Sequence, residues 1–146
     1  MKSNVERFDE ITGHIFAHLY LNFPVEMSFD YSRWGCEVDE DYWQDPNSDD
    51  SRRSQRERDI VDGTFRFLEK SGYISYIATL NGGYLNVTLT EKALLSLKRH
   101  PDSLTGSKTF GDVIAEAFED GAKEKMKGAV GTVMSMAFAS LTGGTI

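Results

Sequence analysis

The segment from Ile74 to Leu89 constrains the fold more than any other part of this sequence. Apolar side chains alternate with polar or mixed ones on both sides of a short turn, which is the period of β-strands with one buried face. The alternating residues are Ile74, Tyr76, Ala78, Leu80, Leu85, Val87 and Leu89. The turn itself, Asn81-Gly82-Gly83, consists of residues that tolerate a positive φ, as tight hairpin turns require. The pattern predicts a β-hairpin.

Helices are predicted on both sides of this hairpin. Residues 51–71 form a long helical pattern whose apolar positions fall only in its later half, and Gly72 supplies the left-handed residue that ends it. After the hairpin, Thr90 is a good N-cap for a short helix, which Pro101 stops.

A further helix is predicted over residues 5–23, because apolar residues recur there at every third or fourth position. Its apolar stripe consists of Val5, Phe8, Ile11, Ile15 and Leu19. Pro24 ends the helix. His14 and His18 lie four residues apart beside the stripe with Glu10 one turn earlier, a spacing that suits a metal ion, but the other candidate ligands Cys36 and His100 are distant in the sequence. We therefore expect two half-buried histidines and no metal.

Residues 24–50 follow neither period, and we expect an irregular acidic loop with one short turn of helix at most. Residues 1–50 hold 12 of the 23 acidic side chains but only three basic ones, and the whole chain has a net charge of −7. A chain this acidic is poorly matched to coating nucleic acid. A calcium loop of the EF-hand type does not fit, because Gln44 stands where that loop needs glycine.

The same loop mixes carboxylates with aromatic rings. This composition is typical of protein-binding surfaces, where rings anchor the partner and carboxylates steer a basic one. The candidate protein-binding residues are Trp34, Asp39, Glu40, Asp41, Tyr42, Trp43 and Asp45. The alternative is a solvated loop whose aromatic rings simply cover the core.

The residues on either side of the hairpin carry a resemblance. They are Arg66-Phe67-Leu68-Glu69-Lys70-Ser71-Gly72-Tyr73-Ile74 and Leu89-Thr90-Glu91-Lys92-Ala93-Leu94-Leu95-Ser96-Leu97. With the hairpin they resemble the helix, Gly-Tyr-Ile, wing, Leu-Thr-x-Lys-Gly-Leu pattern of bacterial winged-helix proteins of uncharacterised function, although Ala93 stands where that pattern has glycine. The run from Pro101 to Asp112 resembles the C-terminal helical tail that is appended to such proteins.

The resemblance and the order of the predicted elements imply an α+β, mostly α fold. We expect a winged helix-turn-helix-like domain over residues 1–100, with a two-stranded β-hairpin wing, followed by a C-terminal helical extension over residues 101–146. Winged-helix proteins include DNA readers and protein-binding adaptors, so the resemblance leaves the partner open.

In such a fold the helix over residues 51–71 is the recognition helix, and four arginines lie at its start. They are the candidate nucleic-acid-binding residues Arg52, Arg53, Arg56 and Arg58. The wing tip offers no Lys or Arg to a minor groove, and the acidic loop precedes the arginines directly. A salt-bridged solvent face, in which Arg52 and Arg53 pair with Asp49 and Asp50, is an equally good interpretation.

The last nineteen residues, 128–146, carry no charge. The apolar helix within them, residues 128–141, is shorter than the roughly 20 residues that span a bilayer. It can pack on its own core, form a homodimer, or lie at a membrane surface, and the sequence leaves these alternatives open.

No catalytic motif, nucleotide fingerprint or cysteine pair is present, so we expect a non-enzyme without cofactors. Cys36 has no partner for an internal disulfide and the start of the chain lacks the apolar run of a signal peptide, which favours a cytoplasmic protein. The leading hypothesis is a protein-binding inhibitor, immunity protein or regulatory adaptor that uses its acidic loop. The alternative hypothesis is a DNA-binding transcriptional regulator that uses the four arginines.

Overall fold

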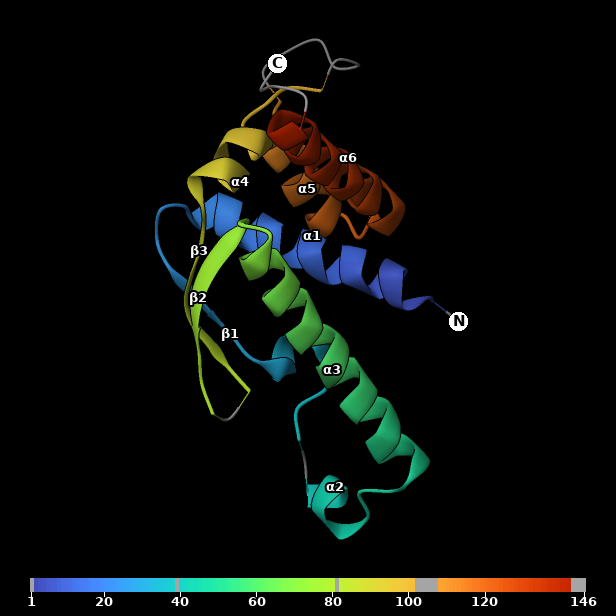
Figure 1. Cartoon of the computed structure of the whole chain (residues 1–146). Helices are drawn as coiled ribbons and strands as arrows, with labels where there is room; N and C mark the ends of the chain where they lie inside the picture. The colour runs from blue at the N-terminus through green and yellow to red at the C-terminus, as the bar shows by residue number, and fades with distance from the viewer. Residues whose placement is uncertain (1, 39, 81, 102–107, 143–146) are drawn as a thin grey trace.

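The computed structural model describes residues 2–38, 40–80, 82–101 and 108–142. The fold is α+β and mostly helical, with a three-stranded antiparallel sheet, as the sequence predicted at the level of fold class (Figure 1). In chain order the elements are α1 (Asn4–Asn22), β1 (Met27–Phe29), the 3-10 helix η1 (Tyr31–Trp34), α2 (Glu40–Gln44), α3 (Asp49–Lys70), β2 (Ile74–Ala78), β3 (Tyr84–Leu89), α4 (Glu91–Leu97), α5 (Phe110–Glu119) and α6 (Lys123–Thr142).

The predicted hairpin is confirmed as β2 and β3. Ile74 pairs with Leu89, and Ile77 pairs with Leu85, in antiparallel register. Gly82 adopts a φ of 80° in the turn, a conformation that glycine adopts without steric cost. Leu80, which the alternation placed in the first strand, lies beyond its end and is fully exposed.

The prediction of an irregular loop over residues 24–50, with one short turn of helix at most, is wrong, because the stretch holds strand β1 and two short helices, η1 and α2. This strand pairs antiparallel with β3, with Met27 opposite Val87, and the strand order is β1-β3-β2. The sheet therefore has three strands instead of the predicted two. Three residues are too few to show an alternation of apolar and polar side chains in the sequence. Strand β1 is instead determined by its pairing with β3.

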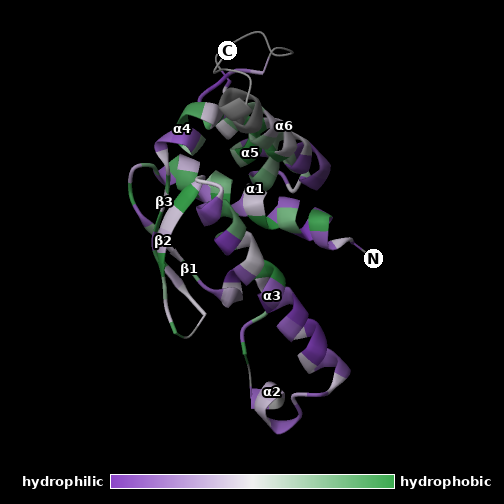
Figure 2. Ribbon diagram, in the orientation of Figure 1, coloured by the Kyte–Doolittle hydropathy of each residue, from purple (hydrophilic) through white to green (hydrophobic). Residues whose placement is uncertain are grey.

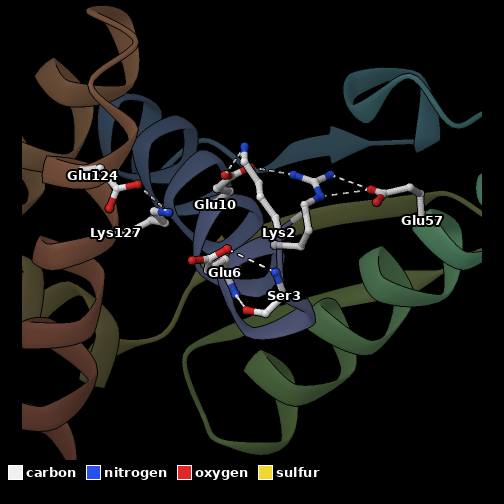
Figure 3. A network of polar contacts seen from close by, with 8 residues as sticks. Lys2, Ser3, Glu6, Glu10, Glu57, Glu124 and Lys127 are labelled. Atoms are coloured by element: carbon white, nitrogen blue, oxygen red, sulfur yellow. Dashed lines mark hydrogen bonds and ion pairs between the residues drawn. The ribbon is translucent and has the colours of Figure 1, made fainter.

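Helix α1 begins at the N-cap Ser3 with a reciprocal pair of hydrogen bonds. The Ser3 Oγ accepts from the Glu6 backbone N–H at 3.2 Å, and the Glu6 carboxylate accepts from the Ser3 N–H at 3.1 Å (Figure 3). The predicted stripe is buried at Ile11, Ile15 and Leu19, but Val5 at its start is 70% exposed. The first turn of α1 extends past the core, which is why its apolar residue stays in solvent.

Helices α5 and α6 pack on α1 and share its hydrophobic core. Ile114 of α5 and Val130 and Val133 of α6 are fully buried. The side chain of Met126 in α6 packs directly against the α1 backbone at Gly13, where an added Cβ would lie 2.7 Å from it. The part of the uncharged segment whose side chains are described therefore packs on the core of its own chain.

Helix α6 lacks the properties of a membrane span. Within the residues that the structure describes, no helix is both long enough and apolar enough to cross a membrane.

Candidate functional site

The residues predicted for partner binding lie mainly on an arm that extends from the rest of the fold. We define the arm as residues 37–59, which include α2 and the first half of α3 (Figure 1). The ribbon of α3 is strongly hydrophilic in this half (Figure 2). The tip of the arm, residues 37–50, contains seven acidic side chains and no basic one. The net charge of the tip, −7, therefore equals the net charge of the whole chain.

Serines join the end of α2 to the start of α3. The hydroxyl of Ser48 accepts from the Ser51 backbone N–H at 3.1 Å and caps α3. The Ser51 hydroxyl, which is buried, donates to the backbone carbonyl of Asp45 at 2.8 Å. Asp49 and Asp50 occupy the first turn of α3, where the helix dipole favours negative charge.

Arg58 closes the arm near its base. Its Nη1 donates to the Cys36 carbonyl at 2.9 Å and to the Ser54 hydroxyl at 2.7 Å, and its guanidinium lies 5.0 Å from the centre of the Tyr42 ring. Only 3% of Arg58 is exposed. The prediction that Arg58 contacts DNA is therefore wrong. Its buried guanidinium bonds to groups on both sides of the arm and is not available to a partner.

The aromatic residues predicted for protein binding are divided between two places. Trp43 on α2 is 75% exposed, and Tyr42 beside it packs edge to face at 5.3 Å. Glu40 and Asp45 are exposed on the same tip, and Asp41 belongs to α2. Asp39 and the side chain of Asp41 lie outside the described residues.

Trp34 is not part of the arm tip, although the sequence grouped it with Trp43. It is half-buried in η1, stacked on Phe29 at 6.1 Å and close to the His14 ring at 5.2 Å. For Trp34 this packing agrees with the alternative interpretation, an aromatic ring that covers the core, and its part in protein binding stays a prediction. No apolar period surrounds this residue in the sequence, so its burial depends on contacts with residues far along the chain.

The remaining candidate arginines, Arg52, Arg53 and Arg56, are exposed on the first half of α3. Arg53 forms an ion pair with Asp50 at 3.0 Å, which confirms one of the pairings predicted for a solvated face. Arg56 donates to the side chain of Asn4 at 3.1 Å.

A network of charged residues fixes the base of the arm to α1. Arg7 bridges Glu57 of α3 at 2.7 Å and Glu10 of α1 at 2.8 Å, and Lys2 also reaches Glu10 (Figure 3). Burial disfavours the Glu10 carboxylate, but its hydrogen bonds from Lys2 and Arg7 outweigh that effect and lower its pKa.

Asp62, further along α3, forms a hub that sequence reasoning missed. It accepts hydrogen bonds from the hydroxyls of Tyr31 in η1 at 2.8 Å and Tyr84 in β3 at 2.5 Å. Burial raises the pKa of both tyrosines, and the nearby carboxylate raises it further. Both hydroxyls therefore stay neutral, and their hydrogen bonds to Asp62 join η1 and the hairpin to α3. Asp62 also borders an open polar cleft of about 500 Å³.

Two kinds of reactive site that the sequence raised, a metal site and a cysteine nucleophile, can be compared with the described residues. No group of three His, Cys, Asp or Glu side chains among them is arranged to hold a metal ion. Burial, followed by the nearby Glu57, raises the pKa of the Cys36 thiol to about 11, so it remains protonated and a poor nucleophile.

Searches against protein-family models, curated proteins and solved structures found no match for this chain.

Proposed function

We propose that this chain is a non-catalytic binding protein that uses the tip of its arm to bind a basic partner protein. One observation carries the proposal: Trp43 is 75% exposed on a tip that holds seven acidic side chains and no basic one. Roles as an inhibitor, an immunity protein or a regulatory adaptor all fit such a surface.

Trp43 provides the apolar part of the proposed interface. Tryptophan is enriched among the residues that dominate binding energy, because its large ring loses much water contact when it enters a pocket. A ring left in solvent adds nothing to the core of its own protein. The surrounding carboxylates would raise the rate of encounter with a positively charged surface, and that contribution weakens as salt screens the charges.

The body is proposed to be of the winged-helix type. Its support is the order of helix, short strand, helices and hairpin, together with the strand order β1-β3-β2. In this arrangement α3 holds the position of a recognition helix, but its first half is incorporated into the arm. The burial of Arg58 and the pairing of Arg53 with Asp50 leave fewer cations for DNA than the sequence suggested.

The proposal is tested by capturing a partner on the tagged chain from native lysate, with and without nuclease. The captured partner is then purified and its affinity measured for Trp43→Ala and for the double variant Glu40→Gln with Asp45→Asn. We expect each change to weaken binding at least tenfold, and we expect the affinity of the unaltered chain to fall as salt rises.

A matched control removes the same amount of charge elsewhere. Glu119 and Asp120 are exposed at the end of α5, and the double variant Glu119→Gln with Asp120→Asn should bind normally. Capture that disappears on nuclease treatment, or tip variants that bind as tightly as the control, would overturn the proposal. The first of these results would favour the DNA-binding alternative.

A further inference from the structure

Strand β2 forms an edge of the sheet that the fold leaves open. The strand order β1-β3-β2 puts β1 at one edge and β2 at the other. The edge strand β1 has three residues, and the carbonyl of its Ser28 accepts a hydrogen bond from Arg33 at 3.4 Å. Strand β2 has five residues, and its backbone bonds to β3 alone within the part of the chain that the structure describes. We propose that the outer edge of β2 binds an extended basic segment of a partner protein as a fourth strand.

The register of the hairpin determines which backbone groups of β2 face outward. The Thr79 N–H donates to the Gly83 carbonyl at 2.9 Å, so residue 79 bonds across the hairpin. Successive residues of an antiparallel strand alternate between bonding to the partner strand and pointing away from it. The N–H and carbonyl groups of Ala78 and Tyr76 therefore point away from β3. Tyr76 is half-buried and Ala78 is exposed, so a further strand can approach these groups.

The hairpin lacks the features that protect an edge strand from pairing. Natural edge strands often carry lysine, proline or inward-pointing charges that prevent another strand from adding. From Ile74 to Leu89 the hairpin contains no charged residue and no proline. On its outer face Ile77, which is 60% exposed, pairs with Leu85, which is 43% exposed. An added strand with apolar side chains on this face would cover Ile77.

The opposite face of an added strand would turn toward the polar cleft between β2 and α3. The hydroxyls of Tyr31 and Tyr84 both donate their hydrogens to Asp62, and the Thr79 hydroxyl donates to the Gly83 carbonyl. These side chains can therefore offer only acceptors to a guest. A guest that supplies several donors matches them, as the ammonium of lysine and the guanidinium of arginine do.

The charges that line the cleft give the same preference. Asp62 is half-buried and Glu69 is exposed, and these two carboxylates face one cation, Arg66. A basic side chain of the added strand would supply donors and compensate the excess negative charge at once. The segment that fits this edge therefore alternates apolar residues, which face outward beside Ile77, with basic residues, which face the cleft.

The test uses three synthetic peptides with blocked ends. The first, Thr-Val-Lys-Val-Lys-Val-Thr, has the proposed alternation. The second, Thr-Lys-Lys-Val-Val-Val-Thr, has the same composition without it, and the third, Thr-Val-Glu-Val-Glu-Val-Thr, has the opposite charge. Binding is followed by the amide signals of Tyr76 and Ala78 in a proton–nitrogen correlation spectrum. We expect the first peptide to shift both amide protons downfield with a Kd below about 1 mM, and the other two to bind at least tenfold more weakly.

Four variants separate binding at the edge from general effects on folding. Ala78→Pro removes one outward N–H, at a position where an edge strand tolerates proline, and should weaken binding at least tenfold. Ile77→Lys places a charge on the edge strand and should also weaken it. Leu95→Lys is the matched control, because Leu95 is 54% exposed on α4, and it should bind normally. Glu69→Gln should weaken binding of the first peptide about threefold or more.

The indole signal of Trp43 reports contacts with the tip of the arm separately, so this test and that of the tip can fail independently. The proposal is overturned if about 2 mM of the first peptide leaves the Tyr76 and Ala78 signals in place, or if the second peptide binds as tightly as the first. Shifts of these two signals with protein concentration alone would also overturn it, because they would place a second copy of this chain at the edge.

Discussion

The body and the arm are held together by different kinds of contact. In the body, large apolar side chains such as Phe16, Phe65 and Leu97 are completely buried between the sheet and the helices. In the arm, the buried members among the described side chains are Ser51 and Arg58, and both act through hydrogen bonds. The apolar Val38 and Trp43 stay exposed.

This difference shows that the arm is not required to build the core. Burial of apolar area dominates the stability of a domain, and the arm contributes little of it. Polar contacts that are partly solvated add about 1 kcal/mol each or less. The residues of the arm are therefore less constrained by folding and available for the binding role proposed above, whereas those of the body determine whether the chain folds.

The largest effect is expected in the body, at Phe65. Its ring stacks on Tyr84 at 3.9 Å with an angle of 2° between the planes, and it is fully buried. Phe65→Ala should lower the free energy of unfolding by about 3–5 kcal/mol, measured by urea unfolding followed by circular dichroism. Val38→Ala in the arm should change it by less than about 0.5 kcal/mol. Similar losses for both variants would contradict the distinction between body and arm.

Asp62 should give the next largest effect. Asp62→Ala leaves the Tyr31 and Tyr84 hydroxyls without their acceptor, at a cost of about 2–3 kcal/mol in the free energy of unfolding. Asp62→Asn retains one acceptor oxygen and should lose less. Asp59, one turn earlier and exposed, accepts a single hydrogen bond from Gln55, so Asp59→Ala serves as the matched change in the arm. A loss at Asp59 as large as that at Asp62 would count against the hub.

The pH dependence of stability should depend on His14 in the body. Because burial lowers its folded-state pKa to about 4, the unfolded chain takes up a proton near the ordinary pKa of 6.5, before the folded chain does. The stability that neutral His14 provides is complete above pH 6.5 and is lost as the pH falls toward 4. We expect a loss of about 2 kcal/mol, less than the full shift would give because the ring keeps some contact with water. His14→Gln should flatten the curve between pH 7 and 5, and an unchanged curve would exclude this role.

Replacing Arg58 should change the free energy of unfolding least, and its effect should be confined to the arm. Arg58→Met removes the bonds to Cys36 and Ser54 but keeps an apolar chain in place, so the free energy of unfolding should fall by only about 1 kcal/mol. Amide hydrogen exchange over residues 42–50 should accelerate about tenfold, while exchange in α1 and α5 should not change. Uniform acceleration throughout the chain would mean that the arm and the body unfold as one unit.

Much of the body could be predicted from the sequence because its elements have periodic apolar residues. The hairpin and α1 follow from such patterns, α3 was expected from a pattern in its later half alone, and α4 was expected from its N-cap Thr90. Strand β1 could not be found this way, because three residues carry no period and their pairing is supplied by β3. The half-buried state of His14 was expected, but the surroundings of its ring depend on where α5 and η1 are placed.

The candidate site was predicted less completely for the same reason. Trp34 and Trp43 have similar surroundings in the sequence, yet the first packs on His14 of α1 and Phe65 of α3 and the second stays in solvent. Arg58 belongs to a run of similar arginines, and only the position of the Cys36 carbonyl singles it out for burial. The destination of a side chain outside a periodic segment is decided by residues that are distant in the chain.

The hydrogen bonds of Arg58, Ser48 and Ser51 fix the shape of the arm and leave the residues between them open to change. The contacts that shape the arm lie at its base and at the start of α3, so the stretch between them is insulated from the core. Substitutions or insertions there should change the free energy of unfolding only slightly. The arm is accordingly a place where an engineer could graft a foreign binding loop without unfolding the body.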